Sequence, residues 1–188
     1  MRIAAMGGAG ILSVSVLLIG CGGQEQSKGV DETAASAAAA APSKVAAEDA
    51  CGLLSADEIN QVLGTQFTDG EESTDDSRQI VTCKFTMTDS NTGVELPVAI
   101  VNVGVSLIDG QESYDTNFDL APAYFGNDPE PTEVPGATKA YIVTNAETDS
   151  PVIGMLVGDR FVTLQIGVEG ATNEQATELA SLAAARST

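Results

Sequence analysis

A strict alternation of apolar and polar residues, which recurs from residue 79 onward, is the feature that most constrains the fold. In residues 96–108 the side chains of Val101, Val103, Val105 and Leu107 occupy every second position, with polar or small residues between them. A period of two is that of a β-strand with one buried face. This pattern, or the short apolar run of a buried strand, predicts strands over residues 79–88, 96–108, 138–144, 152–157 and 160–168.

Capping signals predict a helix at each end of the folded region. Ser55 is a favoured N-cap residue, Glu58 completes a capping box three positions later, and Gly64 suits the end of a short helix. Thr172 and Gln175 repeat the capping-box pattern ahead of an alanine-rich segment near the C-terminus. Both helices therefore have defined starts before any packing is considered.

A third helix is predicted over residues 111–121, ended by the proline that follows. Tyr114 and Phe118 are four residues apart and share one side of it. Together with Tyr124 and Phe125 they make up half of the eight aromatic side chains. Such a cluster can line a ligand groove, but aromatic side chains more often form core, which is the expectation here.

Two segments have the composition of loops. Residues 69–76 are acidic, and residues 126–136 contain three prolines. The acidic segment lacks the ligand spacing of a twelve-residue calcium loop, so a solvated loop is expected. The order helix, two strands, helix, three strands, helix then predicts a single α+β domain over residues 51–188. Its centre is a mainly antiparallel five-stranded sheet with flanking helices.

The segment before this domain has a different composition. Residues 22–50 are rich in Gly, Ala, Ser, Gln and Glu and hold almost no large apolar side chains. Such a segment cannot bury enough surface to offset the entropy of ordering it. A flexible tether is predicted.

The N-terminus carries an export signal. Arg2 precedes an apolar stretch, residues 3–19, and the run Leu-Leu-Ile-Gly-Cys at positions 17–21 resembles the lipobox of bacterial lipoproteins. The resemblance implies a signal peptide over residues 1–20, a fatty acid on the Cys21 thiol and a lipidated tether over residues 21–50. It places the protein in the cell envelope, held outside the cytoplasm by its lipid. An uncleaved membrane anchor is the alternative.

The lipoprotein resemblance also implies a destination: in a cell with two membranes, Gly22 in place of a retaining aspartate favours the outer membrane, and the expected location is there or at the cell surface. If Cys21 carries the lipid, Cys51 and Cys83 remain as an even pair. In an oxidising compartment two such cysteines most often form a disulfide, and this pairing is expected. A zinc site is disfavoured, because the chain has no histidine and two thiols do not complete a tetrahedral site.

The net charge is strongly negative. It is −19 for the whole chain, and removal of residues 1–20 would take away Arg2 and bring it to −20. Such a charge repels phosphate backbones, so nucleic acid is an unfavourable partner. A solvated acidic surface is the expected role of these side chains, with cation binding and adaptation to high salt as alternatives.

The pattern Cys-x-Leu-Leu-Ser-x-x-Glu-Ile at 51–59, with a second cysteine in the following strand, resembles small actinobacterial-type lipoproteins of unknown function. It is also similar to the extracellular sensor domains of some bacterial serine/threonine kinases. The resemblance covers residues 51–186 and implies an α/β sandwich like that of the photosystem-associated PsbP proteins. It implies no catalytic residues. Relatives often carry a tryptophan after the second cysteine, where this chain has Phe85.

Catalytic chemistry is restricted by composition. Without histidine, Ser-His-Asp and Cys-His mechanisms are impossible, and no nucleotide-binding or nucleophile-elbow motif is present. The predicted function is a non-catalytic binding module, without cofactor or metal, for an envelope protein, a glycan or a small molecule. A hydrolase that uses two carboxylates and a purely structural surface lipoprotein are the alternatives.

Overall fold

The computed structural model describes residues 49–88 and 95–187. The predicted signal peptide, almost all of the tether, the lipid site at Cys21 and the turn after residue 88 lie outside these residues. The elements, in chain order, are α1 (Ala56–Leu63), β1 (Glu71–Asp75), β2 (Ile80–Thr88), β3 (Glu95–Ser106), α2 (Gly110–Phe125), β4 (Glu130–Thr132), β5 (Lys139–Asn145), β6 (Ser150–Val157), β7 (Arg160–Gly167) and α3 (Asn173–Ser187).

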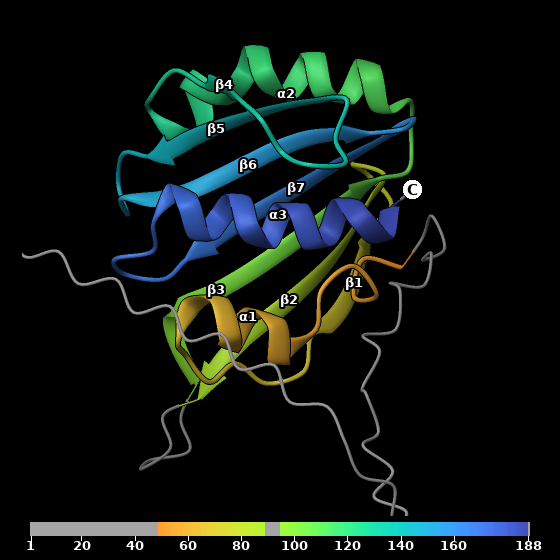
Figure 1. Ribbon diagram of the computed structural model, residues 1–188. Coiled ribbons are helices and arrows are strands. Elements are labelled where there is room, and N and C mark those ends of the chain that lie inside the picture. Colours follow the sequence, from red (N-terminus) through yellow and green to blue (C-terminus); the bar gives the residue numbers. More distant parts are fainter. Residues whose placement is uncertain (1–48, 89–94, 188) are drawn as a thin grey trace, which may run out of the picture. The chain divides into compact units, whose positions relative to one another are not determined.

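The fold is α+β, with one open antiparallel sheet of seven strands in the order β1-β2-β3-β7-β6-β5-β4 (Figure 1). Each half of the chain forms its own antiparallel ladder. The ladders join where β3 pairs with β7, for example at Val103 opposite Leu164. The predicted count of five strands is therefore wrong. The two additional strands, β1 and β4, lie at opposite edges of the sheet.

Both edge strands fall in segments that were expected to be loops. β1 lies within the acidic segment, and all five of its side chains are exposed. It carries no apolar alternation because both of its sides are exposed to solvent. Its backbone pairs with β2 from Glu71 opposite Lys84 to Asp75 opposite Ile80. β4 contains Pro131, which a sheet tolerates at an edge, where an N–H is not needed.

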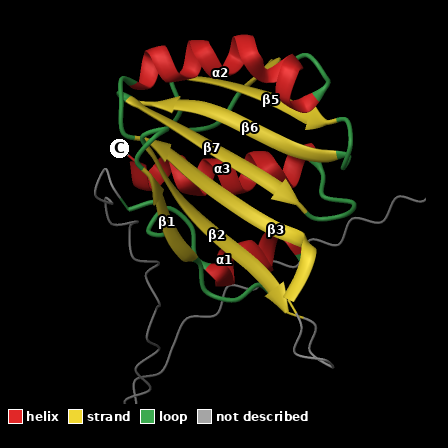
Figure 2. Ribbon diagram, turned by 180° about the vertical axis from the view of Figure 1, so that it is seen from behind, coloured by secondary structure: helices red, strands yellow, loops and turns green. Residues whose placement is uncertain are grey.

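One side of the sheet, here called the core face, is covered by α1 and α3. In Figure 2 these two helices lie behind the sheet. The odd positions of β2 and β3 and the even positions of β7 point to this side, as the two-residue period predicts. Its fully buried side chains include Cys83, Phe85, Val101, Val103, Val105, Ile153, Met155, Val162, Leu164, Ile166 and Leu179.

The predicted caps of α1 are confirmed. Ser55 accepts a hydrogen bond from the Glu58 amide while the Glu58 side chain accepts one from the Ser55 amide, and Gly64 is left-handed at φ 67°. The second predicted capping box is confirmed as well. The Thr172 amide donates to Gln175 Oε1 at 3.0 Å, and the Gln175 amide donates to Thr172 Oγ1 at 3.2 Å.

Two contacts tie the elements of the core face together. Arg186 near the end of α3 donates to the Glu58 carboxylate at 2.8 Å and to the Leu53 carbonyl at 2.9 Å. Cys51 and Cys83 form a disulfide that links the segment before α1 to β2, with their Cα atoms 4.9 Å apart. Among the described residues, no helix is long and apolar enough to cross a membrane.

α2 differs from its prediction. It continues through Pro122 to Phe125 and ends at Gly126, whose amide donates to the Pro122 carbonyl at 3.0 Å. A proline in the last turn removes one helical hydrogen bond, and burial of the inward side compensates for that loss. Leu107, expected on the buried side of β3, lies after the end of the strand and is exposed.

Candidate ligand-binding groove

The opposite side of the sheet, here called the groove face, is only partly covered. α2 packs over β5, β6 and β7 and leaves β1, β2 and β3 without a helix. A groove of about 770 Å³ lies beside α2 on this open part. This volume is within the range of small-molecule sites, about 300–1,000 Å³. Its floor holds a row of polar or small side chains beside apolar ones. The polar or small residues are Ser73, Thr82, Lys84, Asn102, Gly104, Thr163 and Gln165, and the apolar residues are Ile80, Val152 and Phe161.

The floor residues come from the strand positions that alternate with the core. Thr163 and Gln165 of β7 flank the buried Leu164, and Gly104 of β3 lies opposite Thr163. On the next strand, Thr82 lies opposite Gly104. The register therefore lines up hydroxyl and amide groups in rows that run across the strands.

α2 supplies one wall of the groove. Ser113 of α2 hydrogen-bonds the β3 side chain of Ser106, with 2.9 Å between the hydroxyl oxygens. Asp109 caps the helix by accepting from the Glu112 amide at 2.9 Å, and the Gly110 amide donates to the Asp159 carbonyl at 3.1 Å. A Cβ at position 110 would overlap the Asp159 backbone, so only glycine allows this close approach. The wall is thus fixed to both β3 and the β6–β7 turn.

Two glycines on the groove face leave room for the side chain of a cross-strand neighbour. A Cβ at Gly104 would stand 2.5 Å from Thr163 Oγ1, so the threonine side chain occupies space that only glycine leaves open. In the same cross-strand row, a Cβ at Gly154 would overlap the ring of Tyr141, its partner in β5. The Tyr141 ring consequently lies across β6 at the inner end of the groove.

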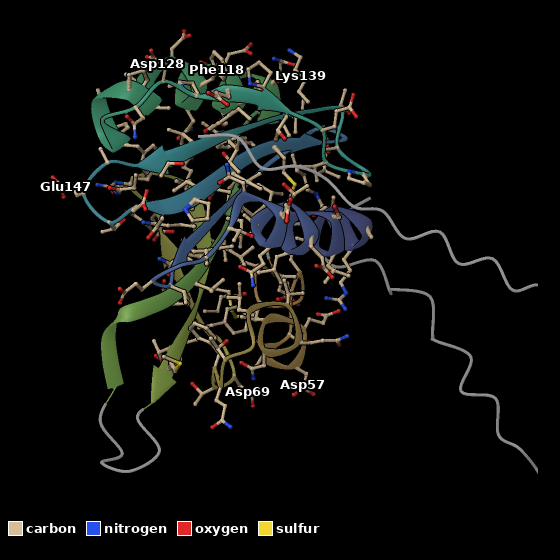
Figure 3. All side chains as sticks on the ribbon, turned by 60° about the vertical axis from the view of Figure 1, so that its left-hand side comes forward. Asp57, Asp69, Phe118, Asp128, Lys139 and Glu147 are labelled. Atoms are coloured by element: carbon tan, nitrogen blue, oxygen red, sulfur yellow. A yellow bond between two sulfur atoms is a disulfide. The ribbon has the colours of Figure 1, made fainter. Side chains whose placement is uncertain are left out.

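Tyr141 joins the groove to an aromatic cluster beneath α2. Its ring centroid lies 5.5 Å from that of Tyr114 and 5.4 Å from that of Phe118, both at edge-on angles. Figure 3 shows Phe118 and Lys139 at the same end of the molecule, where α2 lies. The Lys139 ammonium lies 5.5 Å from the Tyr114 ring centroid. The cluster fills the space between α2 and the sheet.

The Tyr141 hydroxyl has no partner within the described part of the chain. The residue is only 2% exposed, it lines the groove, and none of the hydrogen bonds among residues 49–88 and 95–187 involves its oxygen. Burial, followed by the neighbouring Tyr114, raises the pKa of the phenol, which therefore remains a neutral donor. Among the described residues, the side-chain oxygen that is fully buried without a partner is that of Thr65, which lies outside the groove. The Tyr141 oxygen therefore keeps contact with the groove, where a water molecule or a ligand group can bind it.

The charges of the groove are balanced. Two cations, Arg78 and Lys84, and two acids, Asp75 and Glu112, line it, whereas the whole chain carries −19. Acidic side chains outside the groove lie on the periphery, as Asp57, Asp69, Asp128 and Glu147 do in Figure 3. The groove therefore differs electrostatically from the chain as a whole.

Neither groove acid is placed as a general acid. The hydrogen bond from Ser77 Oγ, at 2.5 Å, holds the pKa of the Asp75 carboxyl below its ordinary value, and both Asp75 and Glu112 are exposed. A catalytic acid needs the opposite, a buried carboxyl whose pKa is raised. Within the described residues, no cluster of three or more Cys, Asp or Glu is arranged to hold a metal ion.

The predicted aromatic cluster divides between core and groove. Tyr114 and Phe118 are packed beneath α2 as expected for core, Phe125 lines the groove, and Tyr124 is 69% exposed. Sequence reasoning missed Tyr141 and the polar floor. The floor positions alternate with core positions along each strand, and this signal alone cannot separate a solvated strand side from a binding surface.

Cys51 and Cys83 lie on the side of the sheet away from the groove, and Cys21 is outside the described residues. Comparison with protein-family models, with curated proteins and with solved structures found no match to this chain. The resemblance to actinobacterial-type lipoproteins and the PsbP-like sandwich therefore stay predictions.

Proposed function

We propose that this protein is a non-catalytic binding module that is anchored in the cell envelope by a lipid on Cys21 and takes its ligand in the groove beside α2. The observation that carries the proposal is the hydroxyl of the otherwise buried Tyr141, which opens into a preformed groove and has no protein partner among the described residues. Ligand sites are typically concave and preformed, with a few convergent polar groups.

Rigidity of the groove supports binding without a large conformational change. The wall is fixed by the bond between Ser106 and Ser113, and the floor is part of a seven-stranded antiparallel sheet. A ligand that enters such a site does not have to order it, which lowers the entropic cost of binding. The hydrolase alternative has no comparable support, because the groove carboxyls are exposed.

Site-specific photo-crosslinking tests the proposal. The full chain would carry p-benzoylphenylalanine at Thr116, an exposed wall residue of the groove, and would be irradiated in its native envelope. The matched control carries the same group at Gln61, which is exposed on α1 on the other side of the sheet. We expect a covalent adduct of defined mass from Thr116 only. Equal adduct patterns from both positions, or none from Thr116, would contradict the proposed binding role.

The anchor is tested separately. Mass spectrometry of the native protein should find an N-terminus that begins at an acylated Cys21, and Cys21→Ser should move the protein from the membrane fraction to the soluble fraction. An intact Met1 with an unmodified thiol at position 21 would refute this part.

A further inference from the structure

We infer that the ligand of the groove is an uncharged oligosaccharide, an inference that rests on the proposed binding function and names the chemical class of its ligand. Three properties of the described residues favour this class: the hydrogen-bonding groups of the floor, the unpartnered phenol at its inner end, and an exposed aromatic ring beside α2. Each constrains a different part of the ligand.

The floor favours a ligand with many hydroxyl groups. Thr82 and Thr163 offer hydroxyls that both donate and accept, while Asn102 and Gln165 each offer an amide with two donors and one acceptor oxygen. A polyhydroxylated ligand can pair with both kinds of group at many points. A fatty acyl chain would leave these groups unpaired, at a cost for each one that it desolvates.

The charge balance favours a neutral ligand. Of the two groove cations, Arg78 has Asp75 beside it at 3.6 Å, and two acids offset the two cations. An anionic ligand would face the field of a chain with net charge −19, whereas an uncharged one gains and loses little from that field. The groove therefore lacks the excess positive charge that binding of phosphate or uronic acid would need.

Tyr141 provides a donor at the inner end of the groove. Its hydroxyl is held by the ring's position over Gly154, so it cannot turn away to bulk water without moving the aromatic cluster. A ligand hydroxyl or ring oxygen is an acceptor that would satisfy it. Such a ligand group would take the place of water at this hydroxyl, whose oxygen is not sealed from the groove.

Tyr124 provides an exposed aromatic face on α2, next in the chain to Phe125, which lines the groove. Thr116 lines the groove, and Leu120 and Tyr124 follow it at intervals of four residues, which keeps all three along one side of α2. Leu120 is 41% and Tyr124 is 69% exposed, although large apolar side chains are usually covered. A flat aromatic ring beside hydrogen-bonding groups suits a sugar ring, which has an apolar C–H face and a polar edge.

The extent of the floor suits several linked rings rather than one. Four neighbouring strands, β1, β2, β3 and β7, contribute to it. At about 4.8 Å between strands, this gives roughly 14 Å across. A short oligosaccharide can lie along this row with its inner end at Tyr141 and other rings near α2.

The test uses the full chain in a detergent without a sugar headgroup. An array of neutral oligosaccharides, with acidic oligosaccharides and tetrapeptides as competitors, identifies a probe, and calorimetry with that probe measures its affinity. We expect binding of neutral oligosaccharides only. Tyr124→Ala should weaken it about tenfold.

Tyr141→Phe is the sharper variant because it removes one oxygen and keeps the ring. We expect a loss of affinity of about three- to tenfold with thermal stability unchanged or higher, since the phenol has no partner to lose in the described protein. The matched control, Tyr114→Phe, removes a hydroxyl from the same cluster outside the groove and should leave affinity unchanged. An equal loss of affinity in both variants would overturn the assigned role of Tyr141.

The outcomes separate this inference from the proposed function. Binding of acidic oligosaccharides or peptides in preference to neutral ones, or a peptide adduct from Thr116, would overturn the oligosaccharide inference and leave a binding module. The inference would also be overturned if neutral oligosaccharides bound and neither Tyr124→Ala nor Tyr141→Phe weakened their binding, because the ligand would then lie elsewhere. Absence of any adduct from Thr116 would remove the proposed function itself.

Discussion

Adjacent residues of β7 show how differently the two faces of the sheet are used. Val162, Leu164 and Ile166 point to the core face and are fully buried, whereas Thr163 and Gln165 point to the groove face and are partly exposed. The backbone and register are shared, so the difference comes from what packs above each side. Two helices cover the core face, and one helix covers part of the groove face.

This comparison separates stability from binding. Removing a core-face side chain leaves a cavity, and its cost appears in the free energy of unfolding. Removing a groove-face side chain from the part that α2 leaves open creates no cavity and exposes no core surface. Mutations there should act on affinity and leave stability nearly unchanged, except where the groove face is covered by α2.

The largest effect is expected from neighbouring substitutions in β7. Leu164→Ala should lower the free energy of unfolding by about 2–5 kcal/mol, because Leu164 is 0% exposed in the main core. Thr163→Ala should change it by about 0.5 kcal/mol. Chemical denaturation of both variants measures the difference. Comparable losses would show that the groove face is as closely packed as the core face.

The next effect concerns the covalent link on the core face. Replacing Cys51 and Cys83 by alanine should lower stability by roughly 2–4 kcal/mol, since the disulfide closes a loop with a sequence separation of 32. Oxidised and reduced protein are compared by urea denaturation, with the double variant in both conditions. Reductant should leave the stability of the double variant unchanged. If reductant lowered the stability of that variant, the loss would come from something other than this disulfide.

A smaller effect is expected where α2 covers the groove face. Gly154→Ala places a methyl group where the Tyr141 ring lies and should cost about 1–3 kcal/mol. The control Gly158→Ala adds a methyl group in open space, and strain from its left-handed φ of 63° is then its only cost. Thermal unfolding measures the stability of both variants. The near-ultraviolet spectrum should change only in Gly154→Ala, because only that substitution displaces the aromatic cluster.

The smallest effect lies at the rim of the core face, between α1 and α3. Burial raises the pKa of Glu58, but hydrogen bonds from Arg186 and Ser55 outweigh it and hold that pKa below the ordinary value of 4.5. A carboxyl whose pKa is lowered by folding stabilises the protein above its unfolded pKa and loses that contribution as pH falls through the folded pKa.

Glu58→Gln keeps the capping-box geometry and removes the charge, so it isolates this contribution. The variant should be about 1 kcal/mol less stable than the original protein near pH 7. This difference in the free energy of unfolding should shrink below about pH 4.5. Urea denaturation at several pH values measures the gap. A gap that persists undiminished at about pH 3 would show that the carboxylate is not its source.

Much of the core face could be predicted from local pattern. The alternation of Val81, Cys83 and Phe85 and the capping box at Ser55 each involve residues close in sequence, and both are confirmed. The edge strands could not be predicted in this way. β1 has no buried side chain, and β4 contains a proline, so only their pairing with β2 and β5 makes them strands.

By itself, the sequence determined which side of β2, β3 and β7 is apolar and where α1 and α3 begin, because periodicity and caps act over a few residues. Only the tertiary structure decided that the two ladders join through β3 and β7, and that α2 covers one part of the groove face and leaves the other open. It also placed the Tyr141 ring over Gly154, with the hydroxyl at the groove. These arrangements depend on contacts between residues far apart in the chain, which no local pattern records.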